Sequence, residues 1–572
     1  MTKDFFFALF SESESYRSME AIEEMLDQSG SLVNIPIQPL YVVFKNQQPE
    51  KVAELLPRLS KEQRQVFLDL DLWEKDEVDV QQFDFWIQAY SSCPDEKIKT
   101  EFVDSEAFAL FLKSKFNIWT FDLEEPVYPD HDNYFLTEDN QLLFEFDEEY
   151  THVQEVQNFV KHIYTYKGVE NAYTHLFKIV SDAHSHLQEE EYRFQKERMR
   201  DVGLVDYFEA LEIESPFPNL IMLDHFIKNK KPSIPDIDSF SKNQTVHSSA
   251  LIAYKDKMND FTQQLSMVKS QKRVDFLKFN FVRLVNSSLV VSHSLKEGTL
   301  AMNRVGQKTR CYMLLGLSYL NDISIPKGDL KLDANESVLE YFDFVEIFRI
   351  GLTLVRHLQK NVKKTIREYG FNEDNEYFLG GLINEFLDHF LDSPPKIQAN
   401  FSERAVEINH IDEFAIAEKL GQTVIDLMPF IYKLYQAFFV LKANGRLQDN
   451  FYLNYTVDEI DFEAIIISSF ANYYLGHLKQ DSAEKLGLTI DECRRFSLWL
   501  LDDSGKIDLT KKDVKVKLKE FIKQFGMESV SSVEDFFFAI LSKQIEGYDY
   551  QELMDQEFKH VGGAILLNSI RQ

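Results

Sequence analysis

Five cationic side chains recur at helical spacing between Arg349 and Arg367. They are Arg349, Arg356, Lys360, Lys363 and Arg367. If a helix that begins near Val338 runs on without a break, their steps of seven, four, three and four residues place them in one stripe about 60° wide. Such a stripe could bind an anionic partner or ligand. The alternative is that it docks on the protein's own acidic helices, and the pattern leaves both interpretations open.

Histidines are concentrated between His152 and His186, which makes this segment the candidate locus for a catalytic or metal site. His184 and His186 are weak candidates for metal ligands. They are two residues apart and would diverge on a helix, where ligands usually stand three or four residues apart, although a loop or a helix start could bring them together. The alternative is a set of surface histidines.

Carboxylates and one imidazole share a helical face at Glu385, Asp388, His389 and Asp392. Di-iron bundles use a Glu-x-x-His motif from each of two helices, whereas here Glu and His are four residues apart and no second copy is evident. An amphipathic helix is therefore the better interpretation. Just before it, Gly380-Gly381 could open a helix and bind an anion, although two glycines are a weak signal.

No recognised catalytic motif accompanies these residues. The sequence contains no phosphate-binding loop, G-x-S-x-G elbow or H-E-x-x-H motif. The three cysteines, Cys93, Cys311 and Cys493, are too few and too far apart for a disulfide framework or a zinc site, so a reducing cytoplasm fits best. These absences lower the prior for an enzyme without excluding one.

Composition excludes one class of partner and predicts a folded protein. With 62 Lys and Arg against 94 Asp and Glu, the 572-residue chain carries a formal net charge of −32, which disfavours binding to nucleic acid. A hydrophobic fraction of 44% and 49 Phe supply enough apolar surface for substantial cores. The most membrane-like stretch, Val424 to Leu441, contains Asp426, Pro429 and Lys433, and predicts a buried helix without membrane insertion.

The apolar periodicity predicts a mainly α, multi-domain protein with a helical-repeat or superhelical architecture. The clearest pattern is in residues 48–70, where Pro49 opens one helix, Pro57 ends it, and a Ser60/Gln63 capping box opens the next. One segment departs from helical spacing, because aromatic-rich runs flank a short polar turn. It predicts a small β-hairpin near 133–146.

Proline, serine and charge clusters suggest domain boundaries. We expect an amino-terminal arm at 1–30 and, after a helical domain at 31–125, a β-hairpin plus helical domain at 126–230. A linker at 231–248 would lead to a central helical domain at 249–395 and a carboxy-terminal helical domain at 396–572.

Within residues 31–125, three stretches resemble the helical repeat in the amino-terminal domain of MgtE-type magnesium transporters and, more loosely, FliG. They are Ile35 to Tyr41, Ala53 to Gln63 and Leu68 to Trp73. The chain also resembles an uncharacterised bacterial family, a domain of unknown function that carries such an MgtE-like segment. This resemblance spans about residues 30–370 and implies a large, mostly helical protein with no established reaction.

Three functional hypotheses follow. The leading one is a non-enzymatic, cytoplasmic helical scaffold or adaptor that recognises another protein through grooves between helices. The second is a divalent-cation-responsive regulator, in which Mg²⁺ would bind abundant carboxylates, and the third is an enzyme of unrecognised type. No cofactor is predicted, and the sequence leaves the partner and the oligomeric state open.

Overall fold

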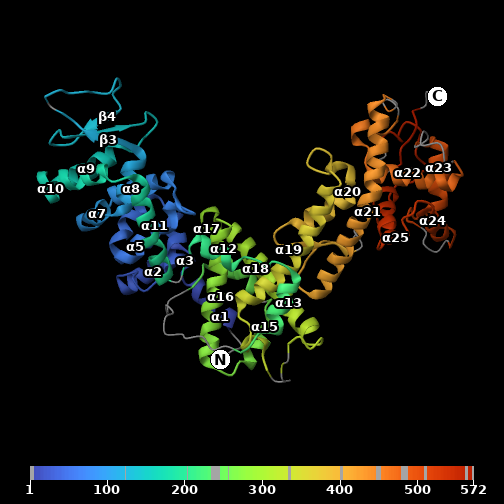
Figure 1. Cartoon of the computed structure of the whole chain (residues 1–572), viewed down its shortest axis with the longest axis horizontal. Coiled ribbons are helices and arrows are strands. Elements are labelled where there is room, and N and C mark those ends of the chain that lie inside the picture. The colour runs from blue at the N-terminus through green and yellow to red at the C-terminus, as the bar shows by residue number, and fades with distance from the viewer. Residues whose placement is uncertain are drawn as a thin grey trace. The chain divides into compact units, whose positions relative to one another are not determined.

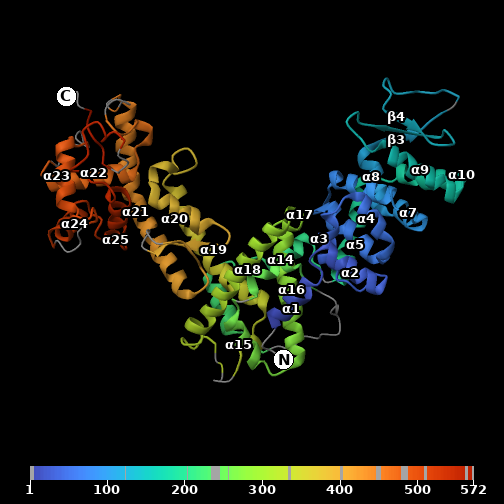
Figure 2. The same cartoon turned by 180° about the vertical axis from the view of Figure 1, so that it is seen from behind.

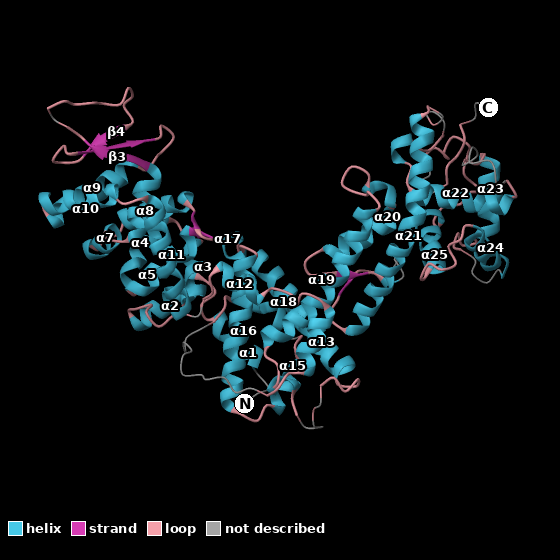
Figure 3. Ribbon diagram, viewed as in Figure 1, coloured by secondary structure: helices cyan, strands magenta, loops and turns pink. Residues whose placement is uncertain are grey.

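The protein is mainly α, as its periodicity predicts, with only short strands in the part of the chain described (Figure 3). The computed structural model describes residues 5–122, 124–202, 204–232, 245–255, 257–330, 332, 336–399, 404–445, 447, 452–477, 487–507, 512–560 and 565–569. Most of the predicted linker at 231–248 lies outside these residues.

The chain divides into two compact units. Unit 1 comprises residues 1–215, 229–310 and 331–349, and unit 2 comprises residues 216–228, 311–330 and 350–572. Figure 1 follows the chain by colour from blue to red. The six domain ranges expected from the sequence are narrower than these units and stay a prediction.

Unit 1 contains most of the shorter helices. Its first twelve are α1 (Phe5–Glu14), α2 (Met19–Ser29), α3 (Ile37–Lys45), α4 (Pro49–Leu55), α5 (Lys61–Leu72), α6 (Phe83–Ser91), α7 (Glu96–Val103), α8 (Glu106–Lys115), α9 (Val153–Lys167), α10 (Val169–Ser181), α11 (His184–Asp201) and α12 (Tyr207–Ile213). It also holds α14 (Ser248–Leu251), α15 (Asn259–Met267), α16 (Gln271–Val291) and α17 (Ser294–Glu297). Two longer helices, α18 (Thr299–Tyr319) and α19 (Phe344–Glu368), contribute residues to both units.

The helix pair predicted in residues 48–70 is confirmed. Pro49 occupies the first position of α4, and a short 3₁₀ turn, Leu56–Arg58, follows that helix. The Ser60 side chain accepts from the Gln63 backbone N–H, and the Gln63 Oε1 atom accepts from the Ser60 backbone N–H. These reciprocal bonds satisfy two amides that α5 would otherwise leave unpaired.

A buried carboxylate ties three of these helices together. Asp71 of α5 is fully buried and accepts hydrogen bonds from the Tyr41 hydroxyl of α3 at 2.9 Å and the Trp86 indole N–H of α6 at 2.7 Å. Lys45 supplies the compensating positive charge. Because a buried charge without partners is costly, this set of contacts fixes how α3, α5 and α6 meet.

The predicted β-hairpin is confirmed and is part of a three-stranded antiparallel sheet with the order β3-β5-β4. The strands are β3 (Phe116–Thr120), β4 (Tyr134–Leu136) and β5 (Leu142–Phe146). The sequence prediction missed β3. Short two-stranded pairs complete the described sheets, namely β1 (Trp73–Glu74) with β2 (Glu77–Val78), and β6 (Lys396–Ile397) with β7 (Val406–Glu407).

Residues 5–29, predicted as an arm, form helices that pack into unit 1. The Phe6 ring of α1 lies 5.2 Å from the Phe281 ring and stacks on Tyr254. The Ser13 and Thr245 hydroxyls share a buried hydrogen bond of 2.9 Å. Phenylalanines at the start of the chain therefore belong to the core of unit 1.

Unit 2 contains the longest helix. Besides its parts of α18 and α19, it holds α13 (Leu220–Lys228), α20 (Gly381–Leu391), α21 (Ile411–Ala443), α22 (Phe462–Leu475), α23 (Ile490–Leu500), α24 (Lys512–Gln524) and α25 (Val533–Ile545). Figures 1 and 2 show α19, α20 and α21 side by side. The Gln359 side chain of α19 donates to the Phe390 carbonyl of α20 at 2.7 Å, which joins the first two.

Two glycines set how closely helices approach α19. At Gly351 a Cβ would lie 2.0 Å from the Tyr312 carbonyl oxygen of α18, so no side chain fits between the two backbones. At Gly421 of α21 a Cβ would meet only side-chain ends, the Val362 methyl at 3.2 Å and Leu358 at 3.3 Å. The first contact is rigid and the second can adjust.

Among the described residues, one helix, α21, is long and apolar enough to cross a membrane by length and composition. Of the residues in its most apolar stretch, 28% are buried. The helix is therefore less buried than the sequence predicted. One face packs through residues such as Leu427, Met428 and Ile431, while Phe439 and Val440 are exposed. One such helix is weak support for a span, and it contains Asp426 and Lys433.

We expect Gly351→Ala to destabilise unit 2 and Gly421→Ala to be nearly neutral or stabilising. Both changes gain about 1 kcal/mol of helix propensity. At position 351 the methyl group meets backbone, and overpacking of this kind costs about 1–3 kcal/mol or more. Hydrogen exchange of the α18 and α19 amides, together with the thermal midpoint, measures the difference. Equal protection in the two variants would contradict the rigid contact.

Candidate functional site

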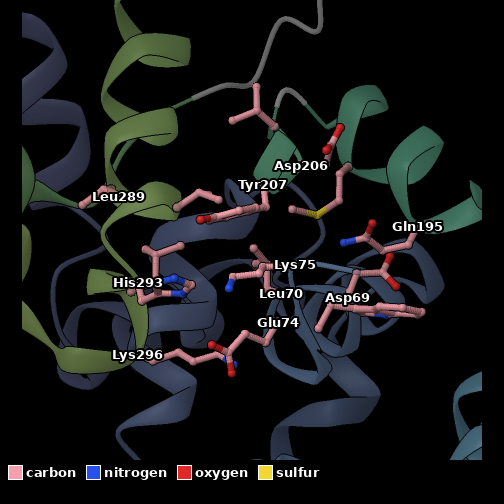
Figure 4. Close-up of a pocket in the computed structure, with 15 residues that line it drawn as sticks. Asp69, Leu70, Glu74, Lys75, Gln195, Asp206, Tyr207, Leu289, His293 and Lys296 are labelled. Carbon is pink, nitrogen blue, oxygen red and sulfur yellow. The ribbon is translucent and has the colours of Figure 1, made fainter. Parts of the chain in front are cut away.

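A small cavity in unit 1 lies among the end of α5, β1, α11, the start of α12 and the turn between α16 and α17 (Figure 4). Its volume is about 70 Å³. Apolar side chains, among them Leu70, Met199 and Leu289, form part of its wall. Helices distant in sequence therefore enclose a space that is large enough for a small molecule.

Aromatic and cationic groups gather on one side of this cavity. The Tyr207 and His293 rings stack with centroids 5.8 Å apart, and the Lys75 ammonium lies 5.9 Å from the Tyr207 ring centroid. Lys75 and His293 both have left-handed backbone conformations, with φ of 61° and 53°. Such conformations cost free energy in non-glycine residues and recur at functional sites.

A buried ion cluster lies behind the opposite side. Arg198 donates two hydrogen bonds to the Asp69 carboxylate, at 2.8 and 2.7 Å, and a third to Glu191 at 2.5 Å. One guanidinium therefore faces two buried carboxylates. Burial raises the pKa of Glu191 to about 7, because a single positive charge cannot fully compensate both anions.

Gln195 lies on α11, between Glu191 and Arg198 of the ion cluster in sequence. Its side chain lines the cavity and only 5% of the residue is exposed. Its Oε1 atom is buried without a hydrogen-bond partner in the described part of the chain, and no bond to its amide nitrogen is found there. No sequence signal pointed to this cavity, since its walls come from segments more than 200 residues apart.

The predicted cationic stripe lies on one unbroken helix, α19. Arg356, Lys360, Lys363 and Arg367 are exposed, as is their neighbour Lys364. We call these five side chains the basic face of α19. Within the described residues, Lys364 pairs with Glu368 at 3.5 Å, and no carboxylate pairs with Lys360, Lys363 or Arg367.

Arg349 differs from the other members of the stripe. It is partly buried, and its Nε donates to the Ser215 carbonyl oxygen at 2.8 Å. Its guanidinium therefore donates a hydrogen bond to a backbone carbonyl group of unit 1. The helix begins at Phe344 and not near Val338 as expected, because Val338–Glu340 forms a separate 3₁₀ turn. The stripe is still continuous, since it starts after Phe344.

Two surface grooves border the basic face. Within the described part of the chain, the first groove, of about 570 Å³, is lined by residues of α19. The second, of about 700 Å³, shares Lys363 and Arg367 with the first. Carboxylates that line the second groove include Asp388 of α20 and Asp392, which directly follows that helix. The acidic face predicted on this helix therefore lies across a groove from the cations.

The α20 helix has the predicted amphipathic character. Phe386, Leu387 and Phe390 are buried, and Glu385 accepts from Gln398 at 2.9 Å and pairs with Lys543. This face thus stabilises contacts to other parts of unit 2.

A carboxylate of the protein itself lies at the N-terminus of α20, where Gly380 and Gly381 suggested that an anion could bind. The buried Glu463 carboxylate of α22 accepts from the Leu382 N–H at 2.6 Å and from the Gln544 amide at 2.8 Å. A Cβ on Gly380 would lie 2.6 Å from the Glu463 side chain. Gly380 therefore admits an internal carboxylate at a helix N-terminus.

The histidines between 152 and 186 have different neighbours. His162 contacts Glu96 at 3.2 Å, His175 lies 3.9 Å from Asp104, and His184 contacts Ser114 at 3.1 Å. His184 and His186 are both exposed at the start of α11. Over the residues whose placement is described, no group of three or more His, Cys, Asp or Glu is arranged to hold a metal ion.

Comparisons with known proteins identify a family without assigning an activity. The profile described as a family of unknown function (DUF6178) matches residues 9–556. Comparison with curated proteins finds no match, and comparison with solved structures finds none. The MgtE-like segment expected in residues 31–125 is not supported by these comparisons.

We expect Glu191→Gln to weaken the pH dependence of stability. Between about pH 4.5 and about pH 7, unfolded chains release a proton that the native Glu191 retains, so native stability falls as pH rises through this window. Glutamine removes that contribution. The thermal midpoint across the window, compared with the exposed-site control Glu190→Gln, measures the change. An unchanged slope in Glu191→Gln would show that Glu191 is already ionised at the lower pH.

Proposed function

The chain belongs to a family of unknown function (DUF6178), and because that name carries no activity, we propose a function from the geometry. The protein acts as a non-enzymatic helical scaffold that holds an acidic segment of a partner protein on the basic face of α19. The observation that carries this proposal is the exposure, on one helix of a chain with net charge −32, of cations that have no carboxylate partner among the described residues, namely Lys360, Lys363 and Arg367.

Charge accounts for the choice of an acidic ligand. A protein with a large excess of carboxylates can pair most of its lysines and arginines internally, yet Lys360, Lys363 and Arg367 have no such partner among the described residues. Like charges on adjacent helical turns also repel one another. A partner that supplies carboxylates relieves this repulsion and gains attraction over the whole face.

Size and surroundings favour a protein segment over nucleic acid. From Arg356 to Arg367 the basic face spans twelve residues, about 16 Å of helix. Beyond its end come Glu368, Glu373 and Asp374, which line the adjoining grooves. A polyphosphate backbone extended past the face would meet these carboxylates, whereas a short acidic segment ends before them.

The proposal includes a cytoplasmic location and protein recognition through grooves. Cys93, Cys311 and Cys493 are buried and form no disulfide, which suits a reducing compartment. The grooves of about 570 and 700 Å³ beside the basic face offer space for the partner's side chains. Repeat architecture and an MgtE-like segment remain hypotheses on which the proposal does not depend.

The Mg²⁺-responsive alternative has no specific support. Carboxylates such as Asp388, Asp392 and Glu373 line one groove, but they do not form a set able to hold a metal ion in the described part of the chain. We therefore do not develop it as a second function.

We expect the triple change Lys360→Gln, Lys363→Gln and Arg367→Gln to weaken binding of an acidic peptide roughly tenfold or more, because three exposed charge pairs contribute about 1–3 kcal/mol together. Fluorescence anisotropy with a labelled decaglutamate peptide measures the affinity at low salt. The same variant should lose the protein partners that co-purify with tagged wild-type protein.

The matched control is the triple change Lys419→Gln, Lys517→Gln and Lys519→Gln. These lysines also lie in unit 2 and pair with the protein's own carboxylates, at 3.5, 3.1 and 3.6 Å. The control alters net charge equally and should retain binding. Equal losses of affinity in the two variants would show that net charge, and not the basic face, causes the binding. Tighter binding of single-stranded RNA than of the peptide would show that the partner is a nucleic acid.

A further inference from the structure

The cavity of unit 1 holds polar groups whose hydrogen bonds the described chain leaves unmade. Gln195 offers a donor and an acceptor at one end. At the other end, Tyr207, His293 and Lys75 make ring contacts but no side-chain hydrogen bond within the described residues. In Figure 4 these three side chains lie on one side of the cavity and Gln195 lies on the other.

The Gln195 amide is the most informative of these groups. It belongs to a residue that is 5% exposed, so bulk water cannot serve it freely. A buried amide without partners costs free energy that an apolar side chain of similar shape would not. Neighbouring side chains such as Met199 and Leu70 have no donor for its oxygen. The group therefore has the properties of a ligand contact more than of a structural one.

The charges around the cavity indicate what kind of ligand fits. Asp69 shares the positive charge of Arg198 with Glu191, and Asp206 lies 3.4 Å from the Lys196 ammonium. Lys296 is similarly paired with Asp79 at 3.4 Å. Lys75 has no carboxylate partner in the described chain, although the Glu74 side chain also lines the space.

We propose that this cavity binds a short-chain hydroxy acid. Its carboxylate lies against the Lys75 ammonium and the Tyr207 hydroxyl, and its hydroxyl group bonds to the Gln195 amide, which can donate and accept at once. Its carbon chain packs on Leu70 and Leu289. A volume of about 70 Å³ admits roughly five or six water-sized groups, which matches an acid of this length. This site is independent of the basic face of α19.

Calorimetry with the full-length protein tests the site, with lactate, propionate and inorganic phosphate as probes. We expect lactate to bind, and to bind more tightly than propionate, which lacks the hydroxyl group. Lys75→Met should weaken lactate binding about tenfold, as expected for a lost charged hydrogen bond. The control Lys97→Met removes an exposed lysine that does not line the cavity and should bind as wild type.

Gln195→Leu provides a second readout that a purely structural residue would not give. It should erase the preference for lactate over propionate and at the same time raise the thermal midpoint of the ligand-free protein, because it removes an unsatisfied buried amide. A lowered midpoint would show that Gln195 has a structural role and would overturn the assignment.

Failure of all three probes to bind at millimolar concentration would also overturn the proposal. Binding of phosphate without lactate would overturn the carboxylate assignment. If the Lys75→Met variant binds lactate as tightly as the wild type, Lys75 does not contact the ligand, and the proposed site is wrong.

Discussion

The direct contact between α18 and α19 at Gly351 is the constraint on which the packing of unit 2 depends. Backbone meets backbone there, so the rotation of α19 about its own axis is fixed within a narrow range. With three faces of α19 turned to α18, α20 and α21, the remaining face points to solvent. The exposure of Lys360 and Lys363 is thus a result of packing as well as of sequence.

Regularities within one helix could be predicted from the sequence. The stripe on α19, the capping box at Ser60 and the amphipathic α20 all depend on residues a few positions apart, and helical geometry fixes their relation. The hairpin at β4 and β5 was predictable for the same reason. The third strand, β3, was not, because it joins β5 only through long-range pairing.

Features that depend on distant residues could not be predicted. Arg349 fits the cationic spacing, yet its contact with Ser215 depends on a segment more than 130 residues away. The glycines before α20 suggested an external anion, while the actual carboxylate comes from Glu463. The Gln195 cavity had no local signature at all. In each case the missing information was which helices meet in three dimensions.

The placement of Glu463 has a consequence for the order of folding. The α20 helix precedes this carboxylate by 81 residues, so during synthesis it emerges from the ribosome without its N-terminal partner. Only when α22 has been made and has docked can the amide of Leu382 exchange water for this carboxylate. Long-range closure of this kind slows folding and leaves early segments exposed to wrong contacts. Folding of unit 2 is therefore completed late, after most of its own residues have been synthesised.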